Sequence, residues 1–171
     1  MLSPVIVQSR RIHENILLNK DSGTTNSTTL AQQINILVRL AGLHRMNDSN
    51  PLTACADILG MLECVLDYQE AGLAVAETPH LALAFIKIAS YYDAAPFVEV
   101  QALSLAEKVL KLYPEAATEE LKEALNILAF QKSRGTAVCS RAMALCAISF
   151  PVRKKPKKHK RRFHKQKTYS L

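Results

Sequence analysis

Two helix patterns follow one another in residues 78–114, and this pair constrains the fold more than any other stretch of the sequence. The first pattern repeats an apolar side chain at steps of four, three and four residues, at Leu81, Phe85, Ile88 and Tyr92. The second repeats one at steps of three, four and three, at Leu103, Ala106, Leu110 and Tyr113. Side chains with this spacing share one face of an α-helix. The stretch therefore predicts an antiparallel helical hairpin with two apolar faces, which further helices must cover.

Threonine and proline residues mark the ends of these two helices. Thr78 before Pro79 predicts a capped helix start, and Pro96 is suited to open the second helix in the same way. Pro114 should end that helix, because proline lacks a backbone donor and restricts the residue before it. The hairpin is thus expected to run from about residue 79 to residue 113.

The flanking sequence carries further helix patterns. They are predicted at about residues 3–18, 28–45, 51–72, 118–131 and 136–150. Residues 5–7 also fit a short extended arm, and residues 73–76 could prolong the third of these helices. Thr28 or Thr29 is expected to cap the second of them, and Thr118 the fourth. The prediction is an all-α fold of six or seven helices in paired hairpins, arranged as a short α-solenoid or an irregular bundle.

The helix phases predict which side chains are buried. The core should include Leu62, Phe85, Ile88, Leu103, Leu110 and Leu125. The first helix should bury Ile6, Ile12, Ile16 and Leu17, and the last should bury Val138, Ala142, Leu145 and Ile148. The basic segment 132–134 is expected at the C-terminal end of its helix, with Gly135 after it.

The charge is distributed unevenly along the chain. Residues 152–171 hold ten of the 22 lysines and arginines and no acidic residue. Residues 1–151 keep the other 12, against 15 acidic side chains, which gives them a net charge of −3. Like charges at the density of residues 152–171 repel one another, and Pro156 interrupts any helix there. We therefore predict a helical body at 1–151 and a disordered polybasic tail at 152–171.

The four cysteines form no recognisable metal or redox motif. Cys55, Cys64, Cys139 and Cys146 include no CxxC pair, and their helical phases keep them from pairing. We interpret all four as buried free thiols, which suit a reducing compartment. No signal peptide is recognised, and no apolar run approaches the roughly 20 residues of a membrane span. The expected location is the cytoplasm, or the nucleus in a nucleated cell.

One stretch of the hairpin resembles a known repeat family. Ala102, Leu103, Glu107, Lys108, Leu110, Leu112 and Pro114 are similar to the second helix of a tetratricopeptide repeat. The preceding helix departs from that pattern, with Ile86, Ser90 and Asp93 at the positions usually taken by an aromatic residue, glycine and tyrosine. Prolines 79, 114 and 151 recur at spacings of 35 and 37 residues, close to the repeat length of about 34. The resemblance implies a concave protein-binding surface and no catalysis.

The candidate binding residues lie mainly in the tail. Its cations suit phosphate groups of a nucleic acid or another polyanion, such as an anionic membrane surface, and its aromatic ring could stack on unpaired bases. The predicted nucleic-acid-binding residues are Arg153, Lys154, Lys155, Lys157, Lys158, Lys160, Arg161, Arg162, Phe163, Lys165 and Lys167. In the body, Tyr91 is a candidate partner-binding residue, whereas Tyr92 follows the apolar stripe. No catalytic constellation, metal site or cofactor motif is recognised.

These observations favour a non-enzymatic adaptor, chaperone or regulator. Its helical body would bind a helix or an extended segment of a protein partner, and its tail a nucleic acid or another polyanion. The alternative is a nucleic-acid-binding protein whose helical body is a dimerising scaffold, so that the chain forms a homodimer. The two interpretations differ in whether the body or the tail carries the main affinity.

Overall fold

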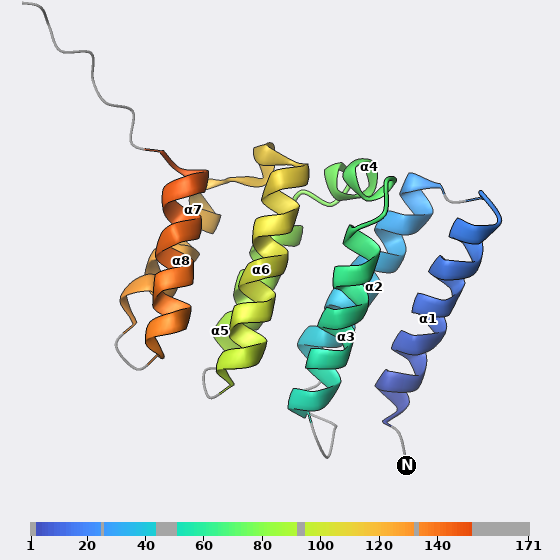
Figure 1. Cartoon of the computed structure of the whole chain (residues 1–171), viewed down its shortest axis with the longest axis horizontal. Helices are drawn as coiled ribbons and strands as arrows, with labels where there is room; N and C mark the ends of the chain where they lie inside the picture. Colours follow the sequence, from blue (N-terminus) through green and yellow to red (C-terminus); the bar gives the residue numbers. More distant parts are fainter. Residues whose placement is uncertain (1–2, 25, 44–50, 92–94, 132–133, 152–171) are drawn as a thin grey trace, which may run out of the picture.

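The structure is a computed structural model of the chain, and it describes residues 3–24, 26–43, 51–91, 95–131 and 134–151. Within these ranges the fold is all-α, as predicted, with eight α-helices and no strand (Figure 1). The elements are α1 (Pro4–Asp21), α2 (Ser27–Leu43), α3 (Pro51–Leu66), α4 (Ala71–Ala76), α5 (Leu81–Tyr91), α6 (Pro96–Leu112), the 3₁₀-helix η2 (Pro114–Ala116), α7 (Glu119–Phe130) and α8 (Thr136–Ser149). The number exceeds the six or seven expected, because α3 ends at Leu66 and the short α4 forms separately. The predicted tail lies outside the described residues.

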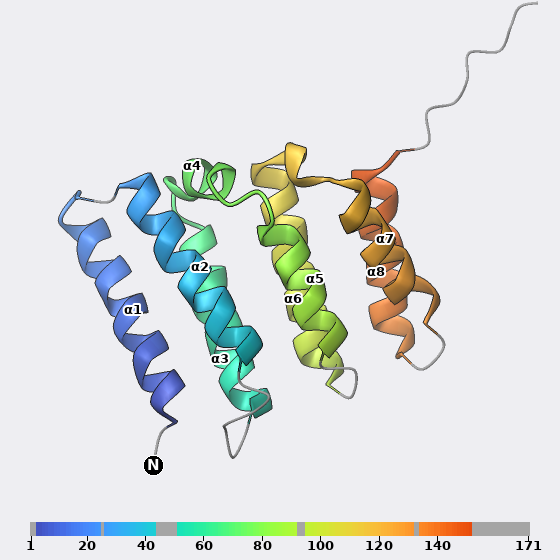
Figure 2. The same ribbon diagram turned by 180° about the vertical axis from the view of Figure 1, so that it is seen from behind.

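The helices stand side by side in a row of hairpins. The pairs α2/α3, α5/α6 and α7/α8 follow one another along the row, and α1 packs against α2 and α3 at one end (Figure 1). One layer consists of α3, α6 and α8, and the second layer of α2, α5 and α7 (Figure 2). The short α4 lies across the upper edge, where it contacts α2 and α6 (Figure 1). Consecutive hairpins thus bury their apolar faces against one another, which is the architecture of a short α-solenoid.

The core lies between the two layers and follows the predicted stripes. The six core positions predicted from sequence, Leu62, Phe85, Ile88, Leu103, Leu110 and Leu125, are all at most 8% exposed. Phe85 is completely buried and is among the largest side chains in the core. Because this ring is buried between the hairpins, the stretch that contains it shows the clearest helical spacing of apolar residues in the sequence.

Two predicted core positions are wrong. Ile148 is 66% exposed and Leu17 is 38% exposed. In α8 the buried stripe ends at Leu145, and the next position on it is the half-buried Ser149, about 100° from Ile148. Leu17 stands about 100° from the fully buried Ile16 for the same reason. Residues 5–7 belong to α1, so the extended-arm alternative is also wrong.

The helix ends confirm some predicted caps and correct others. Thr118 caps α7, since its hydroxyl accepts a hydrogen bond of 3.2 Å from the Leu121 amide. Thr78 does not cap α5, which begins only at Leu81. Its hydroxyl instead donates to the carbonyls of Ala74 and Val75 at the end of α4, at 3.1 Å each. At the start of α2 the capping acceptor is neither Thr28 nor Thr29 but the Asn26 side chain, 2.9 Å from the Thr28 amide.

The cysteines are free but not all buried. Cys55 is buried and Cys64 is exposed, while Cys139 and Cys146 are half-buried. The prediction of four buried thiols is therefore wrong for Cys64. Cys55 and Cys64 lie nine residues apart in α3, which places them on opposite sides of the helix and gives them opposite environments.

Candidate binding groove between α2 and α5

The two layers differ in how their helices are joined at the surface. In the layer of α3, α6 and α8, ion pairs cross each junction, including the one with α1. They are Arg10–Asp57 at 4.0 Å, Lys108–Asp67 at 2.7 Å and Arg141–Glu107 at 2.7 Å. The pKa of Glu107 lies below its usual value, mainly because Lys111 donates a hydrogen bond to its carboxylate and also because Arg141 is close. Ion pairs therefore join the helices of this layer at each junction, and a small hollow of about 140 Å³ remains between α6 and α8.

The other layer is more open. Lys87 of α5 and Glu120 of α7 form an exposed ion pair of 3.5 Å. Between α2 and α5, by contrast, no ion pair crosses the surface in the part of the chain that the structure describes. A groove with a cavity volume of about 390 Å³ lies there instead. Figure 2 shows this layer nearest the viewer, with α2 and α5 side by side below α4.

The groove, which we call the α2–α5 groove, is built from three parts of the chain. It is lined by Asn35, Val38 and Arg39 of α2, by Glu77, Thr78, Pro79 and His80 of the turn before α5, and by Leu81 and Ala84 of α5. Val38, Thr78 and Leu81 are buried and form its floor. The side chains at the rim, Asn35, Arg39, Glu77, Pro79 and His80, are exposed. The groove thus combines a mostly apolar floor with a polar rim.

Two interactions hold the α4–α5 side of this groove in place. Ser27 at the start of α2 donates a hydrogen bond of 2.8 Å to the Glu77 carboxylate. Thr78, described above, joins the same turn to the last carbonyls of α4. These three hydrogen bonds connect the turn to both α2 and α4, so this wall of the groove is fixed by contacts on either side.

The arrangement suits an extended or helical peptide segment. An apolar side chain can enter between Val38 and Leu81, while Arg39 and Asn35 offer donors at the rim for a carboxylate or for backbone carbonyls. Arg39 and Asn35 are four residues apart on α2, so they lie on the same face of that helix. A cavity of this volume is within the range of ligand-binding clefts.

The predicted partner-binding residue lies near this groove but does not line it. Tyr91 is 50% exposed at the end of α5. It lies seven residues after Ala84, a rise of about 10 Å, and Lys87 stands between them on the same face. Tyr92, predicted to belong to the core, lies outside the described residues, as do all eleven predicted nucleic-acid-binding residues, from Arg153 to Lys167. The groove itself was not predicted, because its walls lie far apart in the sequence.

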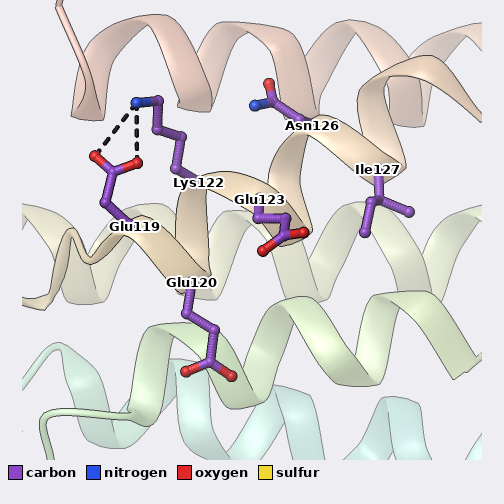
Figure 3. A pocket seen from close by; sticks show the side chains of 6 residues that line it. All are labelled: Glu119, Glu120, Lys122, Glu123, Asn126 and Ile127. Carbon is purple, nitrogen blue, oxygen red and sulfur yellow. Dashed lines mark hydrogen bonds and ion pairs between the residues drawn. The ribbon is translucent and has the colours of Figure 1, made fainter.

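A second hollow, on α7, offers no converging chemistry. It has a volume of about 690 Å³ and is lined by Glu119, Glu120, Lys122, Glu123, Asn126 and Ile127, all from one helix. In Figure 3 the Glu119 carboxylate turns to Lys122, at 3.1 Å, whereas that of Glu120 points the opposite way. These carboxylates do not form a pair that could share a proton. No group of three or more potential metal ligands occurs among the residues that the structure describes.

Comparison with known proteins returned no similar protein. No protein-family model, no curated protein and no solved structure matches the chain. Within the described ranges, none of the helices combines the length and apolar character needed to span a membrane.

Proposed function

We propose that the protein is a non-enzymatic adaptor, chaperone or regulator whose helical body binds a segment of a protein partner. The segment lies in the α2–α5 groove and continues along α5 past Lys87 toward Tyr91. The observation that carries this proposal is the groove itself, which has a mostly apolar floor and a polar rim. It lies in the layer of α2, α5 and α7, where no ion pair joins α2 to α5 among the described residues. The resemblance of residues 102–114 to tetratricopeptide repeats is a separate reason to expect protein binding.

The tail supplies the second part of the proposed function. Ten cations in twenty residues suit binding to the phosphates of a nucleic acid or another polyanion. The body, with a net charge of −3 over residues 1–151, is less suited to such a partner. The protein thus connects a peptide segment bound by the body to a polyanion bound by the tail.

Charge reversal at the groove rim tests the first part. The full-length protein is used to capture partners from a lysate treated with nuclease, alongside the variants Arg39→Glu and Arg11→Glu. Both arginines are exposed and both changes alter the net charge equally, but only Arg39 lines the groove. We expect Arg39→Glu to lose partners that Arg11→Glu retains. Retention of all body-dependent partners by Arg39→Glu would contradict the proposed groove.

A second candidate function is favoured by the tail alone. Here nucleic-acid binding is the main activity and the helical body serves as a dimerising scaffold. Capture with and without nuclease separates the two functions. Partners that disappear with nuclease depend on the tail and its nucleic acid, whereas partners that persist depend on the body.

A further inference from the structure

The rim of the α2–α5 groove carries one permanent charge of each sign. Among the described residues that line it, Arg39 of α2 is the one arginine or lysine, and Glu77 of the turn before α5 is the one acid. Both side chains are exposed, and neither forms an ion pair within the part of the chain that the structure describes. At the neighbouring junction, by contrast, Lys87 and Glu120 already pair with each other. The groove therefore offers two opposite charges to a partner.

The two charges lie toward opposite ends of the groove. The Glu77 carboxylate is held at the start of α2, because its Oε1 accepts a hydrogen bond of 2.8 Å from the Ser27 hydroxyl. Arg39 follows Ser27 by about three turns of the same helix, a rise of about 18 Å. Helical side chains lean toward the N-terminus of their helix, so the guanidinium lies somewhat closer than that. The separation matches about four or five residues of an extended chain, at about 3.3 Å per residue.

The floor of the groove fits an apolar side chain of an extended segment. Val38 and Leu81 are only 8% and 2% exposed, and the small side chain of Ala84 leaves space beside them. A helix is at least 10 Å across with its side chains, so an 18 Å stretch of it occupies roughly 1,400 Å³. The groove has a volume of about 390 Å³, which is a closer match to a single extended chain (Figure 2).

We infer that the α2–α5 groove selects an extended partner segment in which an apolar side chain is flanked by one acidic and one basic residue. The acidic residue pairs with Arg39, and the basic residue pairs with Glu77. The apolar side chain enters between Val38 and Leu81, and the two charged residues are about four or five positions apart. This inference rests on the proposed function of the groove and specifies the chemistry of its partner.

The two charges act mainly on selectivity. An exposed ion pair adds little affinity, whereas a like charge at the same position is repelled. A segment with two acidic residues would place one of them against Glu77, and a segment with two basic residues would place one against Arg39. The groove therefore disfavours segments of uniform charge. The chain's own residues 152–171 contain no acidic residue and do not meet this requirement.

Selection from a peptide library tests this chemistry. Random peptides displayed on phage are selected on the immobilised full-length protein at about pH 8, where histidine side chains are neutral. Inorganic polyphosphate in excess suppresses binding to the basic tail. Ala84→Trp places a large ring in the groove and identifies the peptides that bind there; Ala84→Leu replaces it if circular dichroism shows that the tryptophan variant is unfolded. We expect the groove-dependent peptides to share an apolar residue between one acidic and one basic residue.

Charge exchange between peptide and groove then identifies each pair, with binding measured by fluorescence anisotropy. Replacement of the acidic residue of a selected peptide by lysine should weaken binding about tenfold. Arg39→Glu should restore the binding of that peptide. Replacement of the basic residue by glutamate should weaken binding similarly, and Glu77→Lys should restore it. Arg11→Glu and Glu115→Lys are the matched controls, because both residues are exposed and lie outside the groove.

The outcomes separate this inference from the proposed function. Groove-dependent peptides without the flanking charges would overturn the inference and leave the groove as a peptide-binding site. The same conclusion follows if Arg39→Glu and Glu77→Lys restore binding no better than their controls do. If no peptide is enriched, or if every enriched peptide binds the Ala84 variant as tightly as the unchanged protein, the proposed function of the groove is contradicted together with the inference.

Discussion

Arg134 and Glu99 form an ion pair inside the protein, with Nη1 2.5 Å from Oε1 and the side chains only 3% and 1% exposed. The same guanidinium donates to the carbonyls of Ala89 and Ser90, at 2.9 and 2.8 Å, and to the Gln131 side chain at 2.7 Å. Arg134 therefore joins the α7–α8 connection to the end of α5 and the start of α6. The sequence predicted a basic residue at the end of its own helix, but Arg134 interacts with the C-terminus of a neighbouring one.

Removal of one partner of this pair should strongly destabilise the fold. Arg134→Met leaves the Glu99 carboxylate buried without its arginine, and we expect the free energy of unfolding to fall by about 3–5 kcal/mol. Arg134→Met combined with Glu99→Met should recover much of that loss, because the second change removes the buried charge. Urea denaturation of the three proteins measures both effects. A loss below about 1 kcal/mol for the single variant would show that the pair is not a buried structural contact.

Phe85 provides a test of the core between the hairpins. Its ring is completely buried, so Phe85→Ala should reduce the free energy of unfolding by about 3–5 kcal/mol. Phe97→Ala is the matched control, because Phe97 has the same side chain and is 59% exposed on α6. Thermal or urea denaturation should show a much smaller loss for Phe97→Ala. Equal losses would contradict the assignment of Phe85 to the core.

His13 should make stability depend on pH. Burial lowers the pKa of this side chain below 6.5, although Glu14 partly opposes the shift, and Nε2 is buried without a hydrogen-bond partner. The unfolded chain therefore binds more protons than the folded chain as pH falls through 6.5 toward the lower folded value. Acidification through this window removes stability. Measured between pH 7 and 5, the melting temperature should fall less for His13→Gln than for the unchanged protein.

Carboxylates can also contribute to the change in melting temperature between pH 7 and 5. The contribution of His13 is therefore read from the difference between variants. His80→Gln is the control, because His80 is exposed. Its melting temperature should follow the unchanged protein at every pH. If His13→Gln and His80→Gln behave alike, His13 does not contribute to the pH dependence.

The row of hairpins and its core could be predicted from sequence because both arise from local periodicity. A helix that buries Phe85 and Ile88 must place apolar residues three and four positions apart, and that spacing is visible without a structure. At the end of an apolar stripe, a shift of one residue decides which side chain is buried. For this reason Ile148 was predicted to be buried although it is exposed. Thr78 was misassigned because the same threonine can cap the following helix or bond to the preceding one.

The candidate site was less accessible to sequence reasoning. The α2 wall of the groove lies about 40 residues before its α5 wall. The buried ion pair poses the same difficulty, because Glu99 and Arg134 lie 35 residues apart. No local pattern reports such a pairing. A signal was present for the ion pair, since Glu99 stands in the buried phase of an otherwise apolar stripe and a buried carboxylate requires a cationic partner. Tyr91, by contrast, was predicted to bind a partner only because it is aromatic and lies off the apolar stripe of its helix.

Binding to the tail should depend on salt rather than on base sequence. If about five of the ten cations contact phosphates on a duplex, the logarithm of affinity should fall against the logarithm of salt concentration with a slope of about −4 to −5. Lysines and arginines that meet phosphates position a nucleic acid without reading its bases. Phe163→Ala should weaken binding to single strands more than to duplex, because unpaired bases expose a stacking surface.

Deletion of residues 152–171 provides the matching control for the tail. It should abolish binding to the nucleic acid and leave the melting temperature of the body nearly unchanged, because a disordered tail, as the sequence predicts, would make few native contacts. If the deletion variant still bound nucleic acid with full affinity, the body and not the tail would carry this activity.

Site-specific photocrosslinking tests the central claim, that the α2–α5 groove holds a partner segment, most directly. A photoreactive phenylalanine analogue is placed at Asn35 in the groove or at Gln101, a half-exposed residue of α6 in the opposite layer. After irradiation in a nuclease-treated lysate, adducts with partner proteins are analysed by mass spectrometry. We predict adducts from position 35 that disappear when Arg39→Glu is added, and none of the same adducts from position 101. Equal crosslinking from both positions, or adducts at position 35 that Arg39→Glu does not reduce, would contradict the account.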